Sequence, residues 1–76
     1  MRIFDLKKDG YQFTWKWERE DGTVVECQTD KEGCGLWEYL PRKAEWRQTK
    51  GTCDFMLRGM SLSGARKKIK RTFIED

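Results

Sequence analysis

The sequence predicts an α+β fold, in which an antiparallel β-meander of four to six strands packs against one C-terminal α-helix. Three observations predict this fold. Aromatic and polar residues alternate from Tyr11 to Trp17, which is the two-residue period of a strand with one apolar face. Asp-Gly pairs separate the early strand-like runs, as they do in hairpin turns. Residues 62–74 contain no proline and carry apolar residues at helical spacing.

The length of 76 residues leaves room for one domain, residues 1–76, with one core. The meander is expected over about 2–57 and the helix over about 61–74. Ten aromatic residues, four of them Trp, concentrate buried area in few side chains. We therefore expect a packed core although only 37% of the residues are apolar.

The first hairpin is predicted from the Asp9-Gly10 pair, which favours a two-residue type I′ turn after a strand over residues 3–8. This register places Phe4 and Leu6 of the first strand on the aromatic face. It does so through three cross-strand pairs: Lys8 with Tyr11, Leu6 with Phe13, and Phe4 with Trp15.

The second hairpin has two candidate loops. A two-residue loop of Asp21 and Gly22 would leave Val25 and Cys27 on the side away from the aromatic face. A three-residue loop over residues 20–22, with Gly22 in the left-handed region of a G1 bulge, returns both side chains to that face. We prefer the three-residue loop and expect it to place Trp17 opposite Cys27.

Two further strands are expected after a polar loop over residues 30–35. The first covers residues 35–40 and stops at Pro41, because proline cannot donate to a strand ladder. The second runs from about Glu45 to Leu57 and bends or splits at Lys50-Gly51. On this strand three apolar side chains share one face: Cys53, Phe55 and Leu57.

The helix is expected to begin after an N-cap serine, either Ser61 or its rival Ser63. At 100° per residue the apolar stripe consists of Leu62, Ala65, Ile69 and Phe73. The opposite side is a basic ridge of Lys67, Lys68 and Arg71, with Arg66 and Lys70 beside it.

Charge is unevenly distributed along the chain. Residues 1–57 carry ten Lys/Arg and eleven Asp/Glu, whereas residues 58–76 carry six and two. No acidic residue occurs between Arg58 and Arg71. A surface of one sign favours an anionic partner, although a solvated helix face is the simpler interpretation.

Catalytic chemistry is not expected, because the chain has no histidine and therefore lacks the commonest general base and metal ligand. The three cysteines lack the paired spacing of zinc knuckles, so neither a metal site nor a cofactor is predicted. Cys27 and Cys53 are expected on apolar strand faces, and Cys34 in an exposed glycine-rich loop.

The sequence is compatible with two roles for three further aromatic residues. Trp37, Tyr39 and Trp46 either complete the core or lie exposed, where they could stack on nucleic-acid bases. The sequence does not decide between the two roles.

We therefore predict a small non-enzymatic binding module for a partner protein or a nucleic acid, acting through the basic helix. The alternative is a structural or self-associating protein, a homodimer through an edge strand. No apolar run spans a membrane or forms a signal peptide, and an intracellular, cytoplasmic location is expected. The candidate contact residues are Arg66, Lys67, Lys68, Lys70, Arg71, Trp37 and Trp46.

Overall fold

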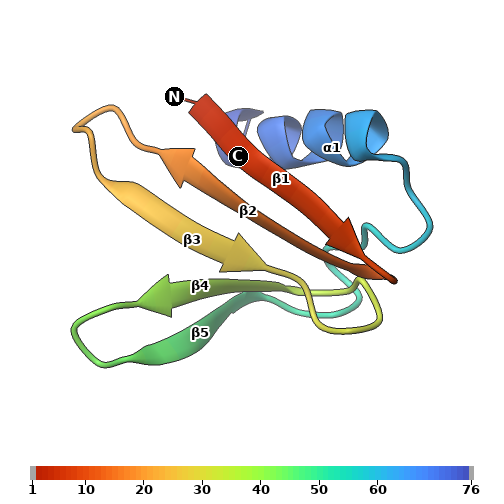
Figure 1. Ribbon diagram of the computed structural model, residues 1–76, viewed down its shortest axis with the longest axis horizontal. Coiled ribbons are helices and arrows are strands. Elements are labelled where there is room, and N and C mark those ends of the chain that lie inside the picture. Colours follow the sequence, from red (N-terminus) through yellow and green to blue (C-terminus); the bar gives the residue numbers. More distant parts are fainter. Residues whose placement is uncertain (1, 76) are drawn as a thin grey trace.

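The computed structural model describes the backbone of residues 2–75 and the side chains of residues 2–73. It contains a five-stranded antiparallel sheet in sequence order, with one helix on one of its faces (Figure 1). The predicted fold class is confirmed. The elements are β1 (Arg2–Asp9), β2 (Gln12–Glu18), β3 (Val24–Gln28), β4 (Leu36–Leu40), β5 (Glu45–Lys50) and α1 (Leu62–Glu75).

The first hairpin turns one residue later than expected. Asp9 pairs with Gln12, so the two-residue loop consists of Gly10 and Tyr11, and Gly10 takes the positive φ of 63°. The predicted pairing of Lys8 with Tyr11 is wrong, because Lys8 lies opposite Phe13. Tyr11 is consequently exposed at the turn, where the Arg58 guanidinium lies 4.2 Å from its ring centre.

A β-bulge in β1 changes which residues of that strand face the core. Between the pairs Phe4–Lys16 and Lys7–Thr14, two residues of β1 oppose Trp15 alone, and Asp5 adopts a φ of 54°. Ile3 is therefore buried and Leu6 packs against the core, while Phe4 turns to the other face. The predicted pairs of Phe4 with Trp15 and Leu6 with Phe13 are wrong for this reason.

The second hairpin has the predicted three-residue loop. The Arg19 N–H donates to the Thr23 carbonyl at 2.8 Å, the Gly22 N–H donates to the Arg19 carbonyl at 2.9 Å, and Gly22 has a φ of 87°. Val25 and Cys27 are buried, as expected. The predicted pairing of Trp17 with Cys27 is wrong by two residues, because this loop pairs Trp17 with Val25 and Trp15 with Cys27.

The fifth strand is shorter than predicted and ends at Lys50. The Asp54 N–H donates to the Gly51 carbonyl at 3.1 Å, which closes a turn over residues 51–54. Cys53 is therefore exposed, contrary to expectation. Phe55 and Leu57 are buried as expected, but they reach the core from a loop that hydrogen-bonds to the loop of Gly33 and Gly35.

Helix α1 begins where Ser61 caps it, since its hydroxyl accepts the Gly64 N–H at 3.1 Å. Ala65 and Ile69 are buried, and Phe73 stacks on Trp17 with ring centres 4.7 Å apart. Leu62 was expected in the apolar stripe but is 47% exposed. The core between helix and sheet consists of Ile3, Phe13, Trp15, Val25, Cys27, Leu36, Phe55, Leu57, Ala65 and Ile69.

Candidate functional site

Helix α1 lies over β1 and β2 on one face of the sheet, and the loop that carries Phe55 and Leu57 packs on the same face, whereas no described segment covers the other face (Figure 1). Side chains alternate along each strand, so residues between buried positions of β2–β4, together with the β5 residues paired with them, point away from the helix. We call this uncovered surface the open face. Its residues on these four strands are Thr14, Lys16, Glu26, Gln28, Trp37, Tyr39, Trp46 and Gln48.

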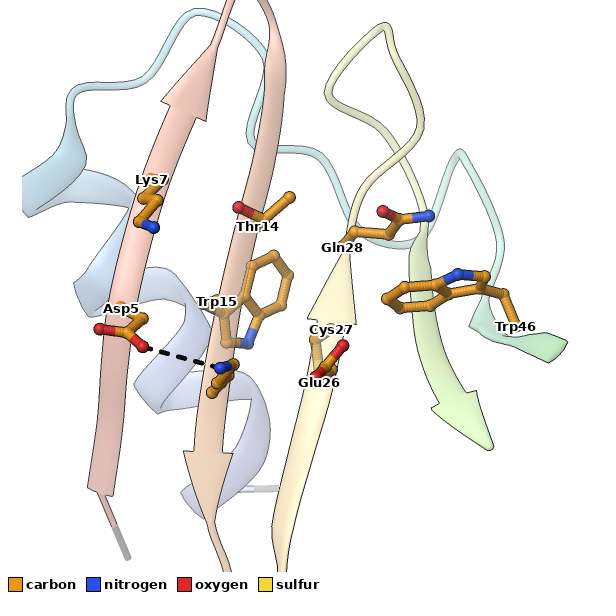
Figure 2. A pocket seen from close by; sticks show the side chains of 9 residues that line it. Asp5, Lys7, Thr14, Trp15, Glu26, Cys27, Gln28 and Trp46 are labelled. Carbon is orange, nitrogen blue, oxygen red and sulfur yellow. Dashed lines mark ion pairs between the residues drawn. The ribbon is translucent and has the colours of Figure 1, made fainter. Parts of the chain in front are cut away.

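A groove of about 310 Å³ crosses the open face from β1 to β3, and Trp46 forms its far wall (Figure 2). Its polar side chains come from three adjacent strands: Asp5 and Lys7, then Thr14 and Lys16, then Glu26 and Gln28. The Asp5 carboxylate lies 3.8 Å from the Lys16 ammonium. Two carboxylates and two ammonium groups balance each other, so the groove offers donors and acceptors with no net charge.

The aromatic side chains of the open face differ in exposure. Trp46 is 38% exposed, and its ring centre lies 5.2 Å from that of Tyr39 at a tilt of 55°. Trp37 is half-buried because its ring lies over Gly35, where a Cβ would approach the ring to 2.5 Å. Trp46 is therefore the aromatic side chain of the open face most available to a ligand, and the Tyr39 ring packs against it.

The helix cations divide into two groups. Arg66 donates to the Ile3 carbonyl at 2.9 Å and Lys68 donates to the Met56 carbonyl at 2.7 Å. Lys67, Lys70 and Arg71 are exposed. The predicted ridge of Lys67, Lys68 and Arg71 is therefore revised, because Lys68 lies against the loop that follows β5 and Lys70 takes its place on the exposed side.

A second groove of about 490 Å³ runs between α1 and β1. We call it the basic groove. It is lined by two leucines, one serine and three cations, with no acidic residue among them: Leu6, Leu62, Ser63, Arg66, Lys67 and Lys70. The sequence did not indicate this groove, because Leu62 was assigned to the buried stripe. The only sequence signal for an exposed Leu62 was its position in the first helical turn, at the end of the row of apolar residues.

The predicted contact residues do not form one site. Trp37 and Trp46 lie on the open face, whereas the helix cations lie on the opposite side of the sheet. A small ligand cannot contact both sets. The chain therefore presents two separate candidate surfaces.

The three cysteines differ in burial, and the buried Cys27 reaches the wall of the open-face groove. Burial first, and then the carboxylate of Glu38, raises the pKa of the Cys27 thiol from 9.0 to about 12. Cys34 is half-buried and Cys53 is exposed. Within the described part of the chain, no group of three or more Cys, Asp or Glu residues is arranged to hold a metal ion.

Within residues 2–75, no helix has the length and apolar character needed to cross a membrane. Comparisons with protein-family models, with curated proteins and with solved structures found no significant match to this chain.

Proposed function

We propose that this chain is a small non-enzymatic binding module and that its basic groove binds an acidic segment of a partner protein. The observation that carries the proposal is the lining of the groove. The exposed Leu62 and the half-buried Leu6 lie beside three cations, and among the side chains that the structure describes no acidic one lines the groove to neutralise them. Such a surface complements a segment that carries both carboxylates and apolar side chains.

The apolar floor favours a protein segment over a nucleic acid. Leu62 is 47% exposed and Leu6 lies beside it in the groove. A phosphate backbone would neutralise the cations but has no apolar group to cover the leucines. An acidic segment that also carries a Leu or Phe side chain can neutralise the cations with its carboxylates and cover the leucines with its apolar side chain.

Arg66 gives the groove a fixed donor. Its bond to the Ile3 carbonyl uses one N–H of the guanidinium, which has five. The guanidinium is thereby held between β1 and α1, and its remaining N–H groups are available to a carboxylate. Lys67 and Lys70 supply charge from the exposed side of the helix.

The test measures fluorescence anisotropy of a short labelled peptide of Asp, Glu and Leu residues, mixed with the parent protein and its variants. Lys67→Glu combined with Lys70→Glu should weaken binding at least tenfold, and Leu62→Ala should weaken it several-fold. Lys31→Glu is the matched control, because Lys31 is exposed in the loop before β4 and lies outside the groove. Its charge change should have little effect.

A labelled DNA duplex provides the opposing result. Binding with a slope of log K against log salt near −3, at about 0.9 per phosphate contacted, would reassign the three groove cations to nucleic acid. Equal peptide binding by the parent and the double variant would also contradict the proposal.

Self-association through an edge strand is the second candidate function, and the difference between the two edges favours β5. The β1 edge is interrupted by the Asp5 bulge and by the bond of Arg66 to Ile3. Every residue of β5 before Lys50 is exposed, and β5 is the last strand on its side of the sheet. Light scattering at low and high salt separates a dimer, whose mass persists at both, from a salt-sensitive binder.

A further inference from the structure

The open face combines features that the basic groove lacks. Trp46 offers an exposed indole, and the groove beside it presents hydroxyl, amide, carboxylate and ammonium groups on three strands (Figure 2). Ligand sites commonly start at about 300 Å³, so a volume of about 310 Å³ suits one flat, polar, largely uncharged group at a time.

We propose that the open face binds single-stranded nucleic acid, with one base stacked on Trp46 and its polar edge directed into the groove. Every base has a π-face, so an exposed indole stacks on bases of any identity. The tilted contact with Tyr39 holds the indole in place, so little side-chain freedom is lost on binding.

The groove supplies the groups that a base edge requires. Gln28 and Thr14 each donate and accept hydrogen bonds, Glu26 accepts them, and Lys7 donates them. The net charge of the groove is zero, which suits an uncharged base better than a phosphate. The phosphates must therefore lie beyond the groove.

Cations for the phosphates lie next to Trp46 in the chain. The turn between β4 and β5 carries Arg42 and Lys43, both exposed, and Trp46 follows Lys43 by three residues. Three residues span at most about 10 Å even when extended, and Lys43 and Ala44 lie in the turn, so the backbone of Lys43 lies within that distance of Trp46. A single-stranded nucleic acid with one base stacked on Trp46 can thus place a neighbouring phosphate at this turn.

The combination of an exposed indole with nearby cations favours single-stranded nucleic acid over a duplex. In a duplex the base faces are already stacked on their neighbours, so Trp46 would gain no contact with them. A neutral sugar chain could use the groove but would gain nothing from Arg42 and Lys43. Unstacked bases joined by phosphates use both parts of the surface.

The experiment measures fluorescence anisotropy of a labelled oligo(U) strand at low salt. Trp46→Ala should weaken binding roughly tenfold or more, which is the loss for one stacked base, whereas Trp46→Phe keeps a stacking ring and should lose less. Tyr11→Ala is the matched control, because Tyr11 is an exposed aromatic residue in the turn between β1 and β2 and does not line the groove. Near-parent affinity of Trp46→Ala would overturn the proposal.

An abasic oligomer of the same length separates base stacking from phosphate attraction. It should bind at least tenfold more weakly than oligo(U), and the salt slope for oligo(U) should be near −1.4 for two phosphates at about 0.7 each. Equal binding of the abasic and intact strands would overturn the proposal. The Lys67→Glu and Lys70→Glu double variant should bind oligo(U) as the parent does, so failure here is distinct from failure of the basic groove.

Discussion

Trp15 connects strand pairing to core packing at the scale of a single residue. It is 2% exposed, it lies opposite the Asp5 bulge, and its ring centre is 6.2 Å from that of Phe55. Among the described residues its indole nitrogen has no hydrogen-bond partner. Its contribution is therefore packing and burial of apolar area.

Replacing Trp15 by Ala should lower the free energy of unfolding by about 3–5 kcal/mol, because the cavity cannot close between β2 and the loop that carries Phe55. Small domains have a total free energy of unfolding of only about 5 kcal/mol or slightly more, so about 2 kcal/mol or less should remain. Trp15→Phe leaves no hydrogen bond broken and should cost less. Urea unfolding followed by circular dichroism measures both, and a loss below about 1 kcal/mol for Trp15→Ala would contradict this role.

The Cys27 thiol should make the stability of the fold depend on pH in the alkaline range. Its pKa is raised from 9.0 to about 12, so the folded protein keeps a proton that the unfolded chain releases. The unfolding free energy should therefore be unaffected by this group below pH 9 and should fall as the pH rises from 9 towards 12. Comparison with Cys27→Ala removes the effect of other titrating groups. A difference between the two proteins that stays constant from pH 8 to pH 11 would contradict the prediction.

At the scale of elements, the sequence predicted each strand and the helix but not every register. The loop of Glu20, Asp21 and Gly22 was predictable because, of the two candidate loops, only the three-residue one places both Val25 and Cys27 on the core face. The Asp5 bulge was not, since Ile3, Phe4 and Leu6 are all apolar and alternation cannot show which of them faces the core. The end of β5 lies at Lys50-Gly51, where the sequence predicts a bend or split, but the path of residues 55–57 depends on hydrogen bonds to the distant loop of Gly33 and Gly35, which leave no local pattern.

Gly33 packs between the turn that carries Tyr11 and the loop that carries Arg58, and its replacement should lower the free energy of unfolding. A Cβ at Gly33 would lie 2.6 Å from the Tyr11 carbonyl oxygen and 2.8 Å from the Arg58 Cα, both of them backbone atoms. Gly33→Ala should therefore destabilise the fold by more than about 2 kcal/mol, because left-handed strain alone costs about 1–2 kcal/mol.

Gly10→Ala is the matched control for Gly33→Ala. Gly10 also has a positive φ, but no atom lies within 4 Å of its Cβ position. It should show the conformational cost of about 1–2 kcal/mol without the clash. Thermal unfolding of the two variants side by side measures the difference, and equal losses would mean that the loops separate easily at Gly33.

At the scale of the whole molecule, the candidate contact residues were predictable as residues but not as surfaces. Charge counting found the helix cations, yet the roles of Arg66 and Lys68 depend on the carbonyls of Ile3 and Met56, which only the folded chain brings near them. The exposure of Trp46 likewise depends on which face of the sheet the helix covers.

The two surfaces should act independently, because the sheet separates them. The double variant Lys67→Glu with Lys70→Glu should weaken binding of the acidic peptide alone, and Trp46→Ala should weaken binding of oligo(U) alone. For each ligand, the binding free energy lost by the variant with all three substitutions should equal the sum of the separate losses to within about 0.5 kcal/mol. Titration of each variant with the acidic peptide and with oligo(U) measures this. A larger coupling would mean that one ligand alters the surface used by the other.

Helix α1 follows all five strands in the chain, yet Ala65 and Ile69 complete the core around Trp15. At about 5–20 residues per second, roughly 3–12 s of translation separate Trp15 from Phe73. Throughout that interval the aromatic side of the meander emerges from the ribosome without its cover, available to chaperones and to other nascent chains. A ribosome pause between β5 and α1 should therefore increase the insoluble fraction of newly made protein.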